Sequence, residues 1–238
     1  SLRRLLVRLR KMATDGRDKR SRIRSSRRLY NLGLELMEEA DVMVGKYPLL
    51  GTVRYRDGLA IALLAARPFR IATFASIRLG QNLERIGDGY QLRFAANEIK
   101  AGPSVEVPVP EALTTAIDRY IAVYRLRLLG SSVDTDFFWI TRYGEAMRPH
   151  AFRKQVAKWT ARRLGTRLSP HLFRDSAATS IAVEDPEHFQ IAKSVLGHSS
   201  LATTDKYYNH ARMLDSSRRY QRAIMKLRQT GVLTRNFR

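Results

Sequence analysis

In the first third of the chain, apolar residues recur at the spacing of an α-helix. Three stretches, at residues 29–44, 53–67 and 70–80, have this spacing and predict three helices. The run GKYP separates the first two stretches, and we expect Pro68 to end the second because a proline interrupts helical hydrogen bonding. This part of the chain is therefore predicted to be helical.

The period then changes to the alternation that is typical of strands. Residues 82–86, 90–94 and 105–109 are short alternating runs, and the turn GDG joins the first two. Such runs with tight turns between them predict an antiparallel three-stranded meander. The apolar run FFWI at residues 137–140 is a candidate for one further, brief strand.

Helical spacing returns after the predicted meander, and Pro and Gly mark several of the helix ends. Pro149 stands near the start of one stretch and Gly165 at its end, while Ser169 and Pro170 form a typical helix start. No internal repeat is visible. The predicted fold class is mainly α with a small three-stranded antiparallel sheet (α+β), and the later helices are expected at residues 111–126, 148–165, 169–183 and 185–198.

The charge is strongly basic and concentrated at the two ends of the chain. The 238 residues contain 43 Lys and Arg against 22 Asp and Glu, a net charge of +21. Residues 1–28 carry 12 basic and 2 acidic side chains, and residues 206–238 carry 9 and 1. Solvated basic tails or a helix on an anionic membrane surface could explain such ends, but this density favours a polyanion, most commonly nucleic acid. The polar, basic segment 17–28 is interpreted as a linker or a DNA-tracking segment.

Composition excludes several classes of protein and site. The hydrophobic content of 44% is that of an ordinary globular protein, and no apolar run is long enough to predict a membrane span. The absence of cysteine excludes disulfides and thiolate metal sites. No cluster of carboxylates has metal-ligand spacing. We therefore expect no metal and no cofactor, and the lack of cysteine fits a protein of the reducing cytoplasm.

Candidate chemistry begins with the sequence PHLFRD, in which His171 and Arg174 are three residues apart and share one helix face. One interpretation is a surface pair with the stem of the histidine buried. The other is a pair of donors directed at one anion near a helix N-terminus, which itself favours anions. The pair alone does not decide between them.

The order of further residues along the chain favours the second interpretation of the pair. Arg70 follows the break at ARPF, Lys100 lies at a turn between two predicted strands, and His198 stands in LGHSS. Two adjacent tyrosines follow in the run TTDKYYNHA. From about Tyr47 to its end, the chain resembles the tyrosine recombinase (phage integrase) family, whose signature residues occur in this order.

The resemblance implies a role for each residue. Arg70 and Arg174 would stabilise charge on the phosphate, and His171 and His198 would add hydrogen bonds. Lys100 would protonate the leaving 5′-hydroxyl. A tyrosine would form a covalent 3′-phosphotyrosine. No metal is needed when arginines stabilise the phosphate charge.

Two features separate this chain from the common family pattern. Pro68 and Thr73 stand where the family often has Gly and Glu. The nucleophile is expected at Tyr208, because the following sequence NHA resembles the residues after family nucleophiles, although Tyr207 has the commoner spacing from His198. A tyrosine pair can also be an ordinary packed, amphipathic pair.

The predicted function is site-specific DNA recombination by an integrase of a mobile genetic element. The alternatives are a type IB topoisomerase-like strand transferase and a non-catalytic DNA-binding module of the same fold. By resemblance, residues 1–46 are the end of an N-terminal helical core-binding domain with its basic linker, and residues 47–238 are the catalytic domain.

The expected partners are double-stranded DNA, further copies of the chain in a tetramer on synapsed DNA, and accessory DNA-bending or directionality proteins. The apolar residues Tyr220, Ile224 and Leu227 form a stripe in the basic tail. The tail could pack on its own domain. The resemblance implies instead an exchange helix that docks on a neighbouring protomer.

Overall fold

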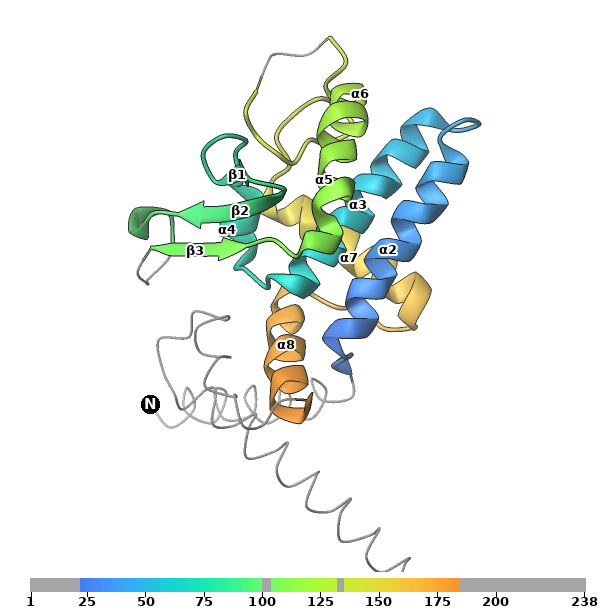
Figure 1. Ribbon diagram of the computed structural model, residues 1–238. Helices are drawn as coiled ribbons and strands as arrows, with labels where there is room; N and C mark the ends of the chain where they lie inside the picture. Colours follow the sequence, from blue (N-terminus) through green and yellow to red (C-terminus); the bar gives the residue numbers. More distant parts are fainter. Residues whose placement is uncertain (1–21, 100–103, 132–134, 185–238) are drawn as a thin grey trace, which may run out of the picture. The chain divides into compact units, whose positions relative to one another are not determined.

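The computed structural model describes residues 22–99, 104–131 and 135–184 (Figure 1). The chain divides after Ala177 into two compact units, and residues 178–184 are the described part of the second. Except for residues 178–184 at the end of the last described helix, the fold discussed below lies in the first unit. Its elements are mostly helical with one antiparallel sheet of three strands, which confirms the predicted fold class.

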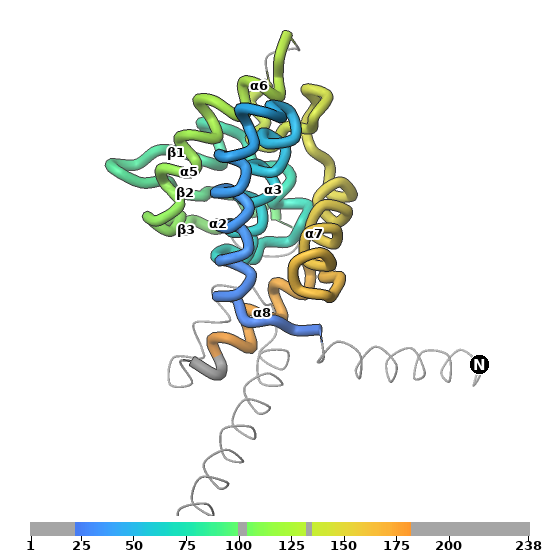
Figure 2. The backbone as a smooth tube through the Cα atoms, turned by 90° about the vertical axis from the view of Figure 1, so that its right-hand side faces the viewer, coloured from blue at the N-terminus to red at the C-terminus, as the bar shows by residue number. Residues whose placement is uncertain are grey.

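Helices α2 (Ser26–Met43) and α3 (Pro48–Ala66) lie side by side in both views of the chain (Figure 1 and Figure 2). Two glycines allow the close approach. A Cβ on Gly33 would lie 2.6 Å from the carbonyl oxygen of Gly58, and one on Gly58 would lie 2.7 Å from that of Gly33. Larger residues at these positions would force the helices apart.

Both helices start earlier than their apolar spacing indicated. The side chain of Ser25 accepts a hydrogen bond from the backbone N–H of Arg28, which caps α2. Pro48 is the first residue of α3 rather than part of a break, because a proline needs no hydrogen-bond partner for its nitrogen in the first turn.

The predicted domain boundary at residue 46 lies in the turn between α2 and α3. Buried leucines of α2, at positions 29, 32 and 36, belong to the same hydrophobic core as those of α3. The division into domains 1–46 and 47–238 stays a prediction.

The sheet has the order β1-β2-β3, with β1 (Leu83–Ile86), β2 (Gly89–Phe94) and β3 (Val105–Pro108). Both pairs are antiparallel, and Leu92 is opposite Leu83 on one side and Val107 on the other. Gly87 has a φ of 57° in the turn between β1 and β2, a conformation that glycine adopts without strain. The predicted meander is confirmed.

The predicted helix at 111–126 forms, but not as one regular helix. A short 3₁₀ turn, Glu111–Leu113, leads into α5 (Thr114–Arg119), a π-helical segment (Tyr120–Arg125) and α6 (Leu126–Leu129).

The run FFWI is not a fourth strand. It forms isolated bridges, Arg78 with Phe137 and Ile140 with Ala146. Phe138 and Trp139 are fully buried, and the Trp139 ring packs on Phe74, Tyr120 and Phe152. Its apolar character therefore reflects a place in the core rather than a strand.

The last described helices are α7 (Pro149–Leu164) and α8 (Pro170–Glu184), which begin at the predicted prolines. Gly165 ends α7 with a left-handed φ of 67°. Among the described residues, no helix is long and apolar enough to cross a membrane.

Arg56 and Asp57 of α3 form a buried ion pair, and a side chain of α7 is hydrogen-bonded to it. The guanidinium of Arg56 donates to Asp57 Oδ1 and to the carbonyl oxygen of Ile140, and the indole of Trp159 donates to Asp57 Oδ2 at 2.9 Å. Both charged groups are buried. Because each has a partner, the pair avoids the cost of an isolated buried charge.

Candidate active site

Arg70 stands at the start of α4 (Ile71–Ala75), directly after the loop that ends α3. It is the N-cap residue, with φ −60° and ψ 137°, and its carbonyl oxygen accepts from the backbone N–H of Phe74 at 2.9 Å. Its side chain is partly buried. The loop and the short helix together fix the backbone from which the guanidinium extends.

Arg174 lies in α8 and is buried, with 7% of its surface exposed. Its Nη1 donates a hydrogen bond of 2.6 Å to the carbonyl oxygen of Pro68 in the loop before Arg70. Burial lowers the pKa of Arg174, the nearby positive charge of Arg70 lowers it further, and Asp175 acts in the opposite direction. The two predicted phosphate-binding arginines, distant in sequence, are therefore brought together.

His171 lies in the first turn of α8, one turn before Arg174, and is exposed. Leu172 and Phe173 between them are buried in the core. Arg174 is not a surface residue, so the interpretation of the two as an ordinary surface pair does not fit. His171 and Arg174 thus occupy neighbouring positions on one helix, as expected for two donors directed at one anion.

The remaining predicted site residues, Lys100, His198, Tyr207 and Tyr208, lie outside the described residues. The strands on either side of Lys100 are described: β2 ends at Phe94 and β3 begins at Val105. Lys100 therefore belongs to the connection between β2 and β3, as its sequence context predicted.

Thr73, where the family often has a glutamate, is buried in α4. Its carbonyl oxygen accepts from the hydroxyl of Ser76 at 3.0 Å. A small neutral side chain avoids placing a carboxylate in this buried position. The substitution is thus compatible with the local packing.

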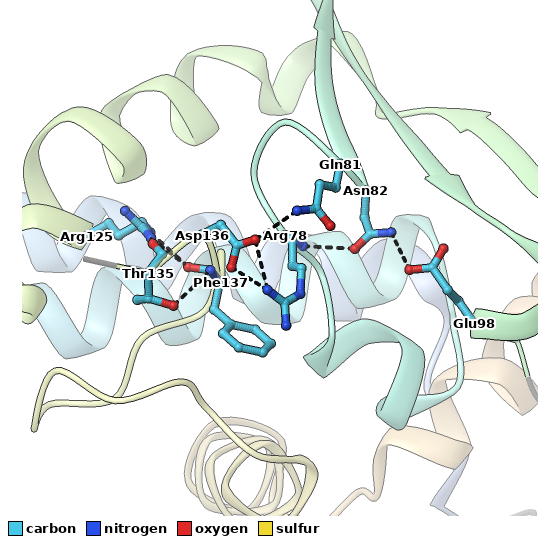
Figure 3. Close-up of polar contacts among 8 residues, drawn as sticks. All are labelled: Arg78, Gln81, Asn82, Glu98, Arg125, Thr135, Asp136 and Phe137. Atoms are coloured by element: carbon cyan, nitrogen blue, oxygen red, sulfur yellow. Dashed lines mark hydrogen bonds and ion pairs between the residues drawn. The ribbon is translucent and has the colours of Figure 1, made fainter. Parts of the chain in front are cut away.

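A hydrogen-bonded network that no sequence signal predicted holds the segment after β2 (Figure 3). Asn82 is 3% exposed, and its amide donates to the carbonyl oxygen of Arg93 (3.2 Å) and to the carboxylate of Glu98 (3.0 Å). Its own oxygen accepts from the backbone N–H of Arg78 (3.1 Å). One buried side chain thus joins the loop before β1 to the segment after β2.

Glu98 is fixed by a second bond, from the backbone N–H of Ala95 to its other oxygen at 2.8 Å. The hydrogen bond from Asn82, with that from Ala95, holds the pKa of Glu98 below its usual value. Ile99 follows and packs against the hydrophobic core. The chain is therefore held by direct contacts up to the residue before Lys100.

The other half of the network joins the loop before β1 to the segment after α6 (Figure 3). Arg78 donates two hydrogen bonds to Asp136, of 2.6 and 2.9 Å, and its guanidinium lies 4.2 Å from the centre of the Phe137 ring. Arg125 of the π-helical segment donates to the carbonyl oxygen of Phe137. The contacts of Arg78 with Asp136 join residues that are 58 positions apart in the sequence.

Replacing Asn82 with alanine should lower the free energy of unfolding by about 1–3 kcal/mol. The change leaves the carbonyl of Arg93 and a backbone N–H without their partner in a buried place. Urea denaturation of the two proteins measures the difference. The matched control is Gln81→Ala, which removes an exposed amide of the same network and should cost less than about 0.5 kcal/mol. Equal effects of the two changes would show that Asn82 does not hold this region.

Among the described residues, no group of three or more His, Asp or Glu side chains could hold a metal ion. The described candidate residues Arg70, Arg174 and His171 all carry hydrogen-bond donors of the kind that anions accept.

Comparison with known proteins finds several that are similar to this chain. The sequence profile of the phage integrase family matches residues 35–214. Tyrosine recombinase XerC of Pseudomonas putida strain F1 is 33% identical over 108 residues, which are 45% of this chain and 34% of XerC. Tyrosine recombinase XerD of Shewanella oneidensis strain MR-1 is 27% identical over 161 residues, 67% of this chain and 51% of XerD. The chain thus spans between a third and a half of these relatives.

Two solved structures have the same fold. The XerH site-specific recombinase, in a post-cleavage complex with its palindromic difH substrate, has a TM-score of 0.58 at 18% identity and covers 80% of this chain and 52% of its own. The XerA recombinase has a TM-score of 0.55 at 16% identity, with 87% of this chain and 63% of its own covered.

Proposed function

Because the chain belongs to the phage integrase family, we propose that it is a site-specific DNA recombinase, which cleaves and rejoins DNA through a 3′-phosphotyrosine intermediate. The observation that supports this most strongly is the hydrogen bond from Arg174 of α8 to the carbonyl oxygen of Pro68, two residues before Arg70, which brings the two arginines together. Two guanidiniums, with the histidine one turn before Arg174 on α8, would provide the donors that a phosphodiester in transfer requires.

In the proposed reaction, the phenolate oxygen of Tyr208 attacks the phosphorus of the scissile phosphodiester. A bond forms between this oxygen and phosphorus, and the bond to the 5′ oxygen breaks. Arg70 and Arg174 stabilise the negative charge on the non-bridging oxygens, with hydrogen bonds from His171 and His198. No phosphate bond is hydrolysed, so a 5′-hydroxyl of another strand can attack the phosphotyrosine and restore the phosphodiester.

Lys100 is proposed as the general acid that gives a proton to the leaving 5′ oxygen. Lys100→Ala should therefore slow cleavage of ordinary DNA. A substrate with sulfur in place of the bridging 5′ oxygen should restore most of the rate, because a thiolate leaves without protonation. Single-turnover cleavage of both substrates measures the rescue. An equal loss on both substrates would argue against the general-acid role.

The proposed partner is double-stranded DNA. The net charge of +21 supports binding to the phosphate backbone, and the relative XerH was solved with its difH DNA. Such binding weakens as salt rises, because each phosphate contact releases counterions. Charge alone gives affinity without sequence preference, so recognition of the recombination site depends on contacts to bases or on DNA shape.

Covalent capture tests the proposed function without knowledge of the DNA site. Genomic fragments from a source organism are incubated with the protein, denatured with detergent and passed through a protein-binding filter. A recombinase should retain fragments that share one sequence, and Tyr208→Phe should retain none. If the parent chain and Tyr208→Phe both retain the same fragments before detergent is added, and neither retains them afterwards, the chain would be a DNA-binding module without strand cleavage.

We also propose that the active form is a tetramer on two DNA duplexes, joined by the tail, and that accessory proteins bend the DNA or set direction. Deleting the residues after Arg219 should leave a DNA-binding monomer that fails to form synaptic complexes. Sizing of protein–DNA complexes with and without the tail measures this. Tetrameric complexes of the shortened chain, or its unfolding, would mean that the tail serves its own domain.

A further inference from the structure

The loop Arg67–Arg70 carries one of the two site arginines and is anchored from several directions. Arg174 holds the carbonyl oxygen of Pro68 at 2.6 Å. The ring of Phe69 packs edge-on against Phe94 of β2, with 5.1 Å between ring centres. The end of α3 supplies a backbone bond from Arg67 to Leu63. Helix and sheet therefore both restrain the backbone that leads to Arg70.

The side chain of Arg67 adds a contact that neither the sequence nor the proposed mechanism explains. Its Nε donates a hydrogen bond of 2.9 Å to the carbonyl oxygen of Pro108, the last residue of β3. The side chain is partly buried, and burial lowers its pKa. Within the part of the chain that the structure describes, no carboxylate pairs with it. Its partner is a backbone carbonyl, so the interaction is a hydrogen bond to a neutral acceptor rather than an ion pair.

The contact is well placed to control Arg70. Pro68 has a fixed φ, and residues 67 and 69 are each tied to the sheet, so the loop has little freedom left. An arginine that stabilises a phosphate must meet it within a few tenths of an ångström, and a displacement of about 1 Å can cost about 10²-fold in rate. Release of the loop from β3 would permit such a displacement.

We propose that Arg67 is a positioning residue, whose Nε–H bond to Pro108 ties the loop to the end of β3 and so aims Arg70 at the scissile phosphate. The proposal rests on the proposed function, since it assigns Arg70 to the phosphate. The sheet would then support both Arg70 and Lys100. Strand β3 anchors the loop of Arg70, and the connection from β2 to β3 contains Lys100.

Three substitutions separate the hydrogen bond from the charge. Glutamine has its Nε2 bonded to Cδ, as Nε is in arginine, so Arg67→Gln keeps a neutral donor at the right place. Arg67→Lys keeps the charge and loses that donor, and Arg67→Met loses both. Arg153→Met is the control for loss of one positive charge, because Arg153 is exposed on α7.

Single-turnover cleavage of a nicked DNA substrate is the measurement, with DNA binding and thermal unfolding followed in parallel. We expect Arg67→Gln and Arg153→Met to cleave within about threefold of the parent chain. Arg67→Met and Arg67→Lys should be slower by about tenfold or more, with little change in DNA binding. The bond to Pro108 would then be the property that matters.

A second substrate distinguishes action through Arg70 from a general loss of structure. A neutral methylphosphonate at the scissile position lacks one of the charged oxygens that Arg70 is proposed to stabilise. The defect of Arg67→Met should shrink several-fold on this substrate, as the defect of Arg70→Ala should. A merely unfolded or loosened variant would be equally slow on both.

Three results would overturn the proposal. Activity in Arg67→Lys but not in Arg67→Gln would mean that the charge itself contacts DNA. Parent-like activity of all three variants would mean that the contact has no role. Equal defects on both substrates would mean a structural role only. If the parent chain forms no covalent adduct, the proposed function fails first, and this proposal falls with it.

Discussion

Replacement of Arg174 with alanine should reduce strand cleavage by about 10²–10³-fold while most DNA binding remains. Loss of one preorganised donor to a developing charge has an effect of this size. Arg174 is buried near Arg70, so a side chain from the protein surface cannot easily reach the same position and supply the lost donor. Binding draws on a net charge of +21, of which one unit is lost.

Arg174→Lys is an informative companion, because it keeps the charge but not the planar, multiply donating guanidinium. It should also be strongly impaired. Cleavage of a nicked substrate and filter binding measure the two properties, and Arg153→Ala on α7 is the control for loss of charge. A loss of DNA binding in proportion to cleavage would make Arg174 a DNA-positioning contact rather than a catalytic residue.

Tyr208→Phe should eliminate the covalent protein–DNA adduct, and Tyr207→Phe should leave a measurable amount. The change removes one oxygen and keeps the ring, so packing is preserved while the nucleophile is lost. If both residues lie on a helix, their side chains point about 100° apart and only one can meet the phosphate. Denaturing gels of protein bound to labelled, nicked DNA measure the adduct. The opposite pattern would assign the reaction to Tyr207.

The sequence could predict the elements that depend on local signals. The GDG turn and the alternating runs predicted the meander, and Pro149, Gly165 and Pro170 predicted helix ends. These features follow from the backbone preferences of a few adjacent residues. The same locality explains why His171 and Arg174, three residues apart, could be recognised as a pair.

Other features depend on contacts between distant segments, which a single sequence does not reveal. The π-helical segment Tyr120–Arg125 adjoins residues after α6: the hydroxyl of Tyr120 accepts from the backbone N–H of Ile140. The run FFWI has the composition of a strand, but aromatic packing in the core explains it equally well. In the sequence, Pro48 fits a break as well as a helix start, because its role depends on which side of it the helix forms.

In the candidate site, too, local sequence features could be predicted and contacts between distant segments could not. The types and order of its residues were predictable, whereas the supports of Arg70 and Lys100 were not. Asn82 and Glu98 are 16 residues apart, and Arg67 and Pro108 are 41 apart. An asparagine before a strand and an arginine at a helix end are common in many proteins, so neither residue has a recognisable sequence signal.

In the proposed function, this chain cuts DNA by becoming covalently joined to it. The most direct test traps the protein on a DNA duplex nicked beside the cleavage point, so that the released short strand diffuses away and religation is prevented. The adduct is then digested with protease and nuclease, and its peptide is identified by mass spectrometry. We expect a nucleotide 3′-phosphate on the peptide that contains Tyr207 and Tyr208, and fragmentation should assign it to Tyr208. Cleaved DNA with a free 3′-phosphate or 3′-hydroxyl and no attached peptide would contradict it.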